Sequence, residues 1–467
     1  MHQEHLRLEP LTITEILQAT CGRAPEDAAD LPQTVCGIST DTRRISPGEM
    51  YIPLVGKNFD GHEFVSEAFA RGAAATLADR SVEADPRRTI LVDDTLTAWH
   101  RIAAHYRRKF AIPVVAITGS YGKTTTKDIV AAALRCHFLH VVKTAANLNN
   151  EYGVPQTIQK IDHRTGAAVI EMAMRGPEQI RPLARVSAPG VAIITTIGEA
   201  HLELLGTQEA ICDAKAELLD ELETDSVAVL PRDSAWFERL SRHVRGRVLT
   251  FGYSHEADVR VLATQPHDAH AQTVELQACS ARLTLPLPLP GPHNAVNLAA
   301  AVAAILALGL TTDPLPDLPN HFEPSGRRHE IVDIAGGWHV LNDAYNAGPA
   351  STIAALDTLA SLPMSGRRAA VLADMLELGP RAPEFHLAVG RHAATILDFL
   401  ITCGDLGGVI GRGARQAGLA NCEHAVTREQ AAHLLRSWAR PGDVVLVKAS
   451  RGMQLDLLVD SLTGDIA

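Results

Sequence analysis

The chain has 467 residues, of which 46% are hydrophobic and 21% are charged, and its formal net charge is −11. This length predicts two to four domains with cores of their own, and the negative charge argues against a nucleic-acid surface, which needs clustered Lys and Arg. Seven scattered cysteines without a C-x-x-C pair, a polar start and no bilayer-length apolar run predict a cytoplasmic protein with reduced thiols and no membrane partner. We expect a monomer.

Residues 1–86 are expected to form a small mixed α/β domain. Its predicted helices lie at residues 12–19 and 64–71, and its predicted strands at residues 35–39 and 50–54. The loop at residues 56–62 is polar and bracketed by glycines, which makes it a candidate ligand loop.

Residues 87–323 are expected to form a second domain, which opens with an amphipathic helix at residues 96–109. The short basic patch within that helix, residues 106–109, is expected to be a solvated face. Apolar strand runs then alternate with helices, and this alternation predicts a parallel sheet covered by helices on both faces. The predicted strands are 167–170, 191–195 and 227–230, and the predicted helices are 178–186 and 208–221.

The last part of this second domain is predicted to be rich in strands. Its predicted strands are 248–253, 259–262, 273–276 and 282–289. The proline spacing in the last of them suits an edge strand. An Ala-rich helix follows at residues 295–308, before Gly309.

Residues 324–467 again alternate between strands and helices, which predicts a Rossmann-like third domain. No dinucleotide G-x-G-x-x-G fingerprint is present in it. The predicted strands are 338–341, 368–372, 399–402 and 444–448, and the predicted helices are 351–359, 385–394 and 429–438.

The segment I-T-G-S-Y-G-K-T-T-T at residues 117–126 predicts a phosphate-binding loop. An apolar strand at residues 114–117 precedes it, and a helix at residues 128–135 follows it. The spacing is two residues shorter than G-x-x-x-x-G-K-[ST], and the alternative is a plain glycine turn between a strand and a helix. The strand-loop-helix context favours ATP binding.

Each part of this loop has a chemical reason for its residue type. Gly119 and Gly122 let the backbone turn so that its N–H groups can face a phosphate. Lys123 brings an ammonium to the β- and γ-phosphates, and Thr124 offers a hydroxyl to Mg²⁺.

Three further residues are candidates for chemistry, and each has a plainer alternative. Glu171 follows a predicted strand at the sheet edge where ligands bind, although it could be a solvated loop acid. His201 follows the next predicted strand, but a lone histidine is more often structural. Lys215 lies in a predicted helix, where a lysine is normally on the surface.

Taken together, several motifs resemble the Mur ligase family. The resemblance runs in order over nearly the whole chain. The segments that carry it are TGSYGKTTT (118–126), NLNNEYGVP (147–155), IEMAMRGPEQI (170–180), TTIGEAHLELLG (195–206), KAE (215–217), GPHNAVNLAAAVA (291–303), NDAYNAGPASTIAAL (342–356), LADMLELG (372–379) and LVKASRG (446–452). Residues 39–73 resemble the family's UDP-substrate domain.

The resemblance implies an ATP-dependent ligase of peptidoglycan precursor synthesis. It is closest to members that add D-alanyl-D-alanine to UDP-N-acetylmuramoyl-tripeptide (UDP-MurNAc-tripeptide) through an acyl phosphate. The implied domains are a UDP-substrate domain (1–86), a central ATP-binding domain (87–323) and a C-terminal domain (324–467). The third would bind the D-Ala-D-Ala side and close on ATP.

The resemblance also implies two Mg²⁺ ions and a lysine carbamylated by CO₂. Thr124 and Glu171 would hold one ion with the ATP phosphates. Glu171, His201 and carbamylated Lys215 would hold the other. A carbamate oxygen can bind Mg²⁺, whereas a protonated lysine would repel it.

The remaining site residues follow from the same resemblance. Arg327, or its neighbour Arg328, would reach the γ-phosphate, so the implied catalytic set is Lys123, Glu171, His201, Lys215 and Arg327. The implied nucleotide contacts are Gly119, Ser120, Gly122, Lys123, Thr124, Thr125, Asn294, Arg327, Asp343, Tyr345 and Asn346. The implied substrate contacts are Asp41, Arg43, Asn147, Asn149 and Asn150.

Four positions depart from the usual family pattern. Thr196 and Gly348 stand where the family usually has asparagine, and Ala373 and Ala449 stand where it usually has glycine. The departure at Thr196 bears on an adenine-side contact. None of the four belongs to the implied metal set.

Other functions compete with this prediction. The absence of a D-N-P-R segment argues against the ligase that adds the third amino acid, and the extra domain at residues 1–86 argues against a folylpolyglutamate synthase. A non-catalytic ATP-binding scaffold of cell-wall assembly remains an alternative, although the implied catalytic residues are intact. A plain ATPase or transport motor is disfavoured because no four-residue apolar run followed by Asp marks a Walker-B acid.

Overall fold

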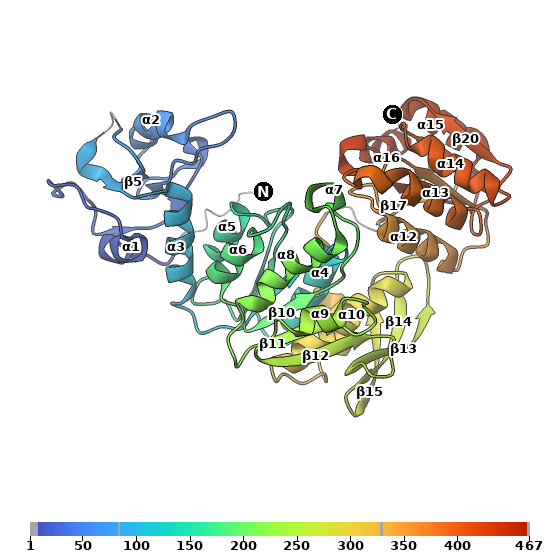
Figure 1. Ribbon diagram of the computed structural model, residues 1–467, viewed down its shortest axis with the longest axis horizontal. Helices are drawn as coiled ribbons and strands as arrows, with labels where there is room; N and C mark the ends of the chain where they lie inside the picture. The colour runs from blue at the N-terminus through green and yellow to red at the C-terminus, as the bar shows by residue number, and fades with distance from the viewer. Residues whose placement is uncertain (1–7, 83–84, 327–329, 465–467) are drawn as a thin grey trace. The chain divides into compact units, whose positions relative to one another are not determined.

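The computed structural model describes residues 8–82, 85–326 and 330–464. The chain forms two compact units, and Figure 1 labels many of their helices and strands. One unit contains residues 1–114, 139–172 and 181–189, and the other contains residues 115–138, 173–180 and 190–467. Among the described residues, no helix has the length and apolar character that a bilayer span requires.

The first unit is built around a parallel sheet of four short strands in the order β3-β4-β5-β6. These strands are β3 (Ile38–Ser39), β4 (Met50–Tyr51), β5 (Ala75–Ala78) and β6 (Thr89–Leu91). The helices of the unit include α1 (Ile13–Thr20), α2 (Val65–Ala70), α3 (Thr95–Arg107) and α5 (Gly153–Ile158). A second parallel pair joins β8 (Val141–Lys143) to β9 (Ala167–Glu171).

Two sequence predictions for this unit are corrected. The single strand predicted at residues 35–39 is two strands, because β2 (Thr34–Val35) pairs with β1 (Leu11–Thr12) and not with the sheet of β3. The basic patch at residues 106–109 is not wholly solvated. Arg107 is 7% exposed, and its guanidinium donates to three backbone carbonyls, which satisfy it inside the protein.

The second unit contains a larger sheet whose strands run in the order β15-β14-β13-β12-β11-β10-β7. The strands are β7 (Val114–Thr118), β10 (Val191–Ile194), β11 (Val227–Pro231), β12 (Arg247–Gly252), β13 (Val259–Pro266), β14 (Gln272–Ala278) and β15 (Ala281–Leu287). Pairing is parallel from β7 to β13 and antiparallel in the β13-β14-β15 meander. The Pro-interrupted strand β15 lies at the edge of the sheet, as its sequence predicts.

Helices on this sheet follow the predicted alternation. They are α4 (Lys123–Arg135), α7 (Leu202–Leu205), α8 (Gln208–Asp220), α9 (Phe237–Ser241), α10 (Pro292–Ala307) and α11 (Leu318–His321). Helix α6 (Ile180–Ser187) belongs to the first unit from Arg181 on. Helix α10 packs on α4, and both are rich in small buried alanines that allow close approach.

The C-terminal part of the second unit has its own sheet, in the order β16-β17-β21-β18-β19-β20. Its strands are β16 (Glu330–Ile334), β17 (Trp338–Asn342), β18 (Arg368–Leu372), β19 (Phe399–Cys403), β20 (Cys422–Ala425) and β21 (Val444–Lys448). Its helices are α12 (Pro349–Ser361), α13 (Ala382–Ala393), α14 (Gly407–Gln416), α15 (Arg428–Trp438) and α16 (Asp456–Thr463). Only β16 pairs antiparallel in this described sheet.

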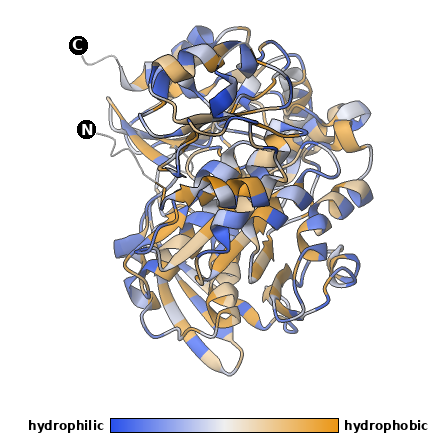
Figure 2. Cartoon of the chain, turned by 90° about the vertical axis from the view of Figure 1, so that its left-hand side faces the viewer, coloured by the Kyte–Doolittle hydropathy of each residue, from blue (hydrophilic) through white to orange (hydrophobic). Residues whose placement is uncertain are grey.

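The C-terminal sheet is buried on both faces, which explains its continuous apolar strands. Along β21, Val445 and Val447 belong to one core, and Val444 and Leu446 belong to the other. Successive side chains of a strand point to opposite faces, so an unbroken apolar run fits a sheet covered on both sides. Figure 2 shows apolar residues gathered along central strands, with hydrophilic residues on outer helix faces and loops.

Candidate active site

The predicted phosphate loop lies between β7 and α4. Gly119 and Gly122 have φ angles of +151° and +81°, which disfavour any side chain. A Cβ on Gly119 would also lie 1.9 Å from the Thr195 hydroxyl oxygen. The Ser120 N–H donates to the Thr196 carbonyl at 2.8 Å, so the loop is tied to the segment that follows β10. Both glycines are therefore required for the shape of the loop.

Helix α4 begins at Lys123, five residues earlier than the sequence predicts. Lys123, Thr124 and Thr125 consequently form its first turn, where the unpaired N–H groups and the helix dipole favour an anion. The Lys123 ammonium donates to the Gly119 carbonyl at 2.7 Å and to the Ser120 carbonyl at 3.2 Å. The arrangement has the chemistry of a phosphate cradle.

His201 lies in the loop after β10, and its side chain is held by the C-terminal part of the same unit. Its backbone has a φ of +67°, and its Nδ1 lies 2.6 Å from Glu377 Oε2. Arg175 donates to the other oxygen of Glu377 at 2.5 Å, and the Glu203 N–H donates to the Glu377 carbonyl at 3.0 Å. Glu377 was not predicted as a site residue, although it stands in the LADMLELG segment. That motif was the only sign in the sequence that Glu377 belongs to the site, and it did not indicate what the residue does.

Lys215 is 1% exposed in α8, so the surface position expected for a helical lysine is wrong. Burial, followed by the nearby charge of Lys123, holds the pKa of Lys215 well below its ordinary value. Burial likewise lowers the pKa of His201, against the opposing effect of Glu377 and with help from Lys215 and Lys123. These three basic residues therefore share one electrostatic environment, in which Lys215 favours a neutral amine.

Glu171 and Asn149 come together in the first unit. Glu171 ends β9 and is 1% exposed, so it is not a solvated loop acid. The Asn149 amide donates to Glu171 Oε1 at 2.8 Å, and the Glu171 N–H donates to the Thr144 hydroxyl at 2.9 Å. Asn150 instead accepts from the Gly153 N–H at 2.9 Å at the start of α5, and Asn147 is exposed.

The predicted nucleoside contacts lie in two places. Asn294 is fully buried in the first turn of α10, and its amide donates to the Pro290 carbonyl at 2.7 Å. In the C-terminal part, Lys448 forms an ion pair with Asp343 and donates to the Asn346 carbonyl at 3.0 Å. Lys448, which holds this loop after β17, was not predicted as a site residue.

Tyr345 is 37% exposed beside these residues, and the Arg451 guanidinium lies 5.5 Å from its ring centroid. An exposed aromatic ring of this kind can pack against a flat ligand. Arg327 lies outside the described residues, so its predicted contact with the γ-phosphate stays a prediction.

Asp41 and Arg43 bind each other in the N-terminal part of the first unit. The Arg43 guanidinium donates to both Asp41 oxygens, at 2.9 and 2.8 Å, and Asp41 also caps the short turn at Thr42–Arg44. The hydrogen bond from Arg43 is the largest cause of the lowered pKa of Asp41. Arg43 is 81% exposed, so it is accessible to an anion.

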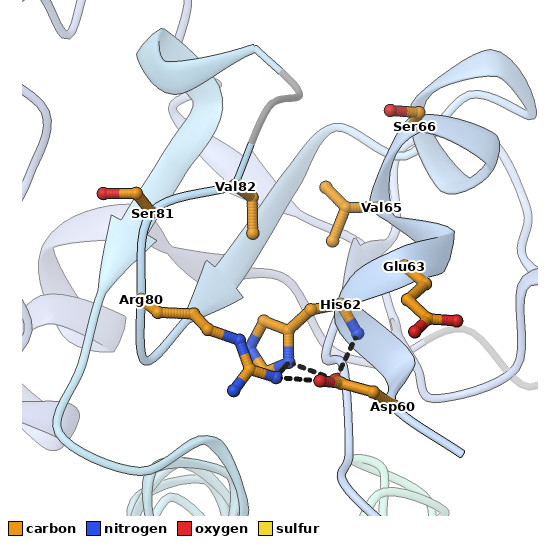
Figure 3. A pocket seen from close by; sticks show the side chains of 8 residues that line it. All are labelled: Asp60, His62, Glu63, Val65, Ser66, Arg80, Ser81 and Val82. Carbon is orange, nitrogen blue, oxygen red and sulfur yellow. Dashed lines mark hydrogen bonds and ion pairs between the residues drawn. The ribbon is translucent and has the colours of Figure 1, made fainter.

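The candidate ligand loop at residues 56–62 borders a cavity of about 280 Å³ (Figure 3). Asp60 and His62 from this loop line it together with Arg80, which follows β5. His62 is held on both sides, with Nδ1 2.8 Å from Asp60 and Nε2 3.2 Å from Asp79. Asp60, His62 and Arg80 therefore form a polar wall of the cavity. Arg80 was not predicted to be part of it.

Comparison with known proteins gives three family-model matches. The Mur ligase middle domain matches residues 117–305, the "Mur ligase, glutamate ligase domain" matches residues 327–451, and the "Mur ligase family, catalytic domain" matches residues 34–107. Two relatives are UDP-N-acetylmuramoyl-tripeptide–D-alanyl-D-alanine ligases. The Bacillus subtilis protein is 36% identical over 92% of this chain and 94% of its own, and the Synechocystis protein is 38% identical over 92% of both.

Solved structures of MurF agree with these matches. MurF from Acinetobacter baumannii has a TM-score of 0.88 and 27% identity, and the match covers 98% of this chain and 100% of the other. MurF ligase from Thermotoga maritima in complex with ADP has a TM-score of 0.82 and 27% identity, covering 92% and 97%. The predicted three-domain α/β fold and ATP-dependent ligase activity are confirmed, and the chain belongs to the Mur ligase family.

Proposed function

We propose that the chain joins D-alanyl-D-alanine to UDP-MurNAc-tripeptide at the cost of ATP, in the cytoplasmic synthesis of peptidoglycan precursors. The observation that carries this proposal is the similarity to two relatives named for this activity. They are 36% and 38% identical to this chain over 92% of its length. The phosphate loop and the buried basic residues behind it supply the chemistry that such a reaction needs. Seven free cysteine thiols support the cytoplasmic location, where we expect a monomer.

The reaction proceeds in two steps. An oxygen of the tripeptide's terminal carboxylate attacks the γ-phosphorus of ATP, and the bond to ADP breaks. The amine of the dipeptide then attacks the carbon of the acyl phosphate, and inorganic phosphate leaves as the amine loses a proton. Both steps depend on holding reactants in line and on neutralising phosphate charge.

Residues of this chain would divide these tasks. Loop N–H groups from Gly119 to Thr125 and the Lys123 ammonium would hold the β- and γ-phosphates. Arg327 would add a second cation. Asn294, Asp343, Tyr345 and Asn346 would hold the nucleoside, and Asp41, Arg43, Asn147, Asn149 and Asn150 would hold the UDP-MurNAc-tripeptide.

The donor set fits Mg²⁺ that arrives with ATP. Among the described residues there is no group of three or more His, Cys, Asp or Glu side chains placed to hold a metal. Mg²⁺ is instead typically bound by one or two carboxylates together with substrate phosphates and waters, a role open to Glu171 and to the Thr124 hydroxyl. When bound, the ion would neutralise charge on the transferred phosphate.

We further propose that Lys215 is carbamylated and that, with Glu171 and His201, it binds a second Mg²⁺. A neutral amine is the form that adds CO₂, and the lowered pKa of buried Lys215 favours that form. The carbamate would convert a buried base into an oxygen ligand. The domain boundaries at residues 86/87 and 323/324 belong to the same proposal, with one ligand assigned to each domain.

The test is phosphate release from ATP and Mg²⁺ with UDP-MurNAc-tripeptide, measured with and without D-Ala-D-Ala. We expect release to depend on the dipeptide and the product mass to equal that of the joined peptide. A non-catalytic scaffold would release no phosphate, and a plain ATPase would release it without the dipeptide. Single D-amino acids and glutamate serve as control acceptors, and preference for one of them would point to another ligase of the family.

A further inference from the structure

The ring of Tyr121, in the middle of the phosphate loop, lies against two glycines. A Cβ on Gly198, which follows β10, would lie 2.8 Å from Tyr121 Cε2. A Cβ on Gly348, at the start of α12 in the C-terminal part, would lie 2.2 Å from the Tyr121 hydroxyl oxygen. The space that each missing side chain would fill is occupied by the ring.

Backbone geometry does not explain either glycine. Gly348 is extended, with φ −148° and ψ 167°, and Gly198 is not among the residues with positive φ. Any residue can adopt such backbone angles. A side chain at either position would therefore meet the Tyr121 side chain.

The backbone of Tyr121 is held as firmly as its ring. Its N–H donates to the Thr196 hydroxyl at 3.0 Å, and its carbonyl accepts from the Thr195 hydroxyl at 2.5 Å and from the Thr196 hydroxyl at 3.2 Å. Burial raises the pKa of Tyr121, so the phenol enters this contact as a neutral group. The loop thus presents one fixed aromatic side chain to the start of α12.

Two residues from distant segments of the chain meet at Tyr121. Thr196 contacts the Tyr121 backbone, and Gly348 lies against the Tyr121 side chain. An asparagine at position 348 would collide with the ring. We call Tyr121 and these two residues the tyrosine contact (Tyr121, Thr196 and Gly348).

We propose that Tyr121 is a positioning residue that docks the C-terminal domain onto the phosphate loop through its contact with Gly348. The proposal rests on the proposed function, because docking matters for holding the nucleoside loop at Asp343–Asn346 over the same ATP. On this proposal, the Tyr121 ring links the binding of phosphate at the loop to the docking of the C-terminal domain. The role is steric positioning and does not require the hydroxyl to react.

A double-mutant cycle tests the proposal with Gly348→Asn, Tyr121→Ser and the double variant. Gly348→Asn should lower kcat about tenfold, because the displaced contact shifts the nucleotide-side loop, while KM for UDP-MurNAc-tripeptide changes less than about twofold. Adding Tyr121→Ser should restore kcat to within about threefold of the wild type, because the smaller side chain leaves room for the asparagine. Gly408→Asn is the matched control, since Gly408 lies in the same domain with nothing within 4 Å of its added Cβ.

Hydrogen exchange of the Thr352 amide gives a second measurement that needs no turnover. This amide donates to the Gly348 carbonyl at 2.9 Å and reports the start of α12. Its protection should fall in Gly348→Asn and return in the double variant. Equal losses in the single and double variants, or a Gly348→Asn enzyme indistinguishable from Gly408→Asn, would overturn the proposal. If the wild type lacks dipeptide-dependent turnover, the proposed function fails, and the exchange cycle still decides the docking role.

Discussion

Burial decides the chemistry of Lys215 more than its sequence position does. A helical lysine is ordinarily exposed, yet this one is 1% exposed and lies near the charge of Lys123. Long-range packing against β10 and neighbouring helices creates that environment, and no local pattern reveals it. The family resemblance identified the residue, and the fold supplies a physical reason for its reactivity.

Replacing Lys215 with alanine should reduce ligase activity by at least about a hundredfold, because the proposed carbamate ligand is lost from a charge-neutralising site. Short carboxylic acids such as formate or acetate should restore part of that activity by occupying the vacated space. The measurement is dipeptide-dependent phosphate release over a series of carboxylate concentrations. Lys160→Ala serves as the control at a half-buried lysine outside the proposed site, and wild-type rates in Lys215→Ala would remove the carbamate proposal.

Site residues were predictable from sequence only where they stand together in a motif. The loop from Gly119 to Thr125 falls into this class, and its residues lie together at the start of α4. Glu377 and Lys448 also stand in family motifs, but each acts on a partner more than 100 positions away in the chain, His201 and Asp343 respectively, so their roles were not predicted. Such pairs depend on how distant strands and loops are arranged in space, and the sequence pattern does not determine that arrangement.

At the scale of elements, periodicity identified most helices and strands but misplaced some of their ends. Helix α4 starts at Lys123 because Gly122 adopts a left-handed turn there, whereas the apolar pattern only becomes helical at Asp128. The edge position of β15 was predictable because proline cannot donate to a sheet ladder. Two-residue strands such as β2 are too short to leave a pattern.

The start of α1 offers a test of pH dependence. Glu15 and Thr12 form a capping box, and Lys109, which follows α3, donates to Glu15 at 2.9 Å. These contacts, led by the hydrogen bond from the Thr12 backbone, lower the pKa of Glu15 from 4.5 to about 2. Because the folded-state pKa is the lower one, the stabilisation is present above pH 4.5 and is lost as the pH falls toward 2.

We therefore expect Glu15→Gln to destabilise α1 by about 1 kcal/mol at pH 7, or roughly fivefold faster amide exchange, and by clearly less at pH 3. Exchange of α1 amides at both pH values, relative to the wild type, checks this difference. Glu67→Gln removes an exposed pair with Arg71 in the same unit and controls for charge alone. A loss in Glu15→Gln that is the same at both pH values would show that the ionised carboxylate is not the stabilising group.

At the scale of the molecule, the order of domains follows from alternating patterns, but strand order and contacts between distant segments do not. Sequence alternation predicts a parallel sheet without saying that β21 inserts between β17 and β18. It also cannot show that the C-terminal part reaches the loop after β10. That contact depends on Glu377, whose backbone is left-handed with a φ of +61°.

Glu377 should couple the C-terminal domain to catalysis, since one carboxylate accepts from both His201 and Arg175. Burial alone would raise the pKa of Glu377, but the hydrogen bonds and charges of His201 and Arg175 lower it, so the group is a carboxylate at neutral pH. Glu377→Gln keeps the shape and removes the charge. Charge-assisted hydrogen bonds contribute more than neutral ones, so we expect kcat to fall about tenfold.

The local measurement is exchange of the Glu203 amide, which donates to the Glu377 carbonyl and should lose protection in Glu377→Ala more than in Glu377→Gln. Glu384→Gln is the matched control, because Glu384 lies in the same domain and pairs only with the exposed Arg381 among the described contacts. If kcat falls while the Glu203 amide stays protected, Glu377 acts on His201 alone and not on docking. If neither changes, the contact between the C-terminal domain and the loop after β10 has no part in turnover, and positioning must come from the tyrosine contact.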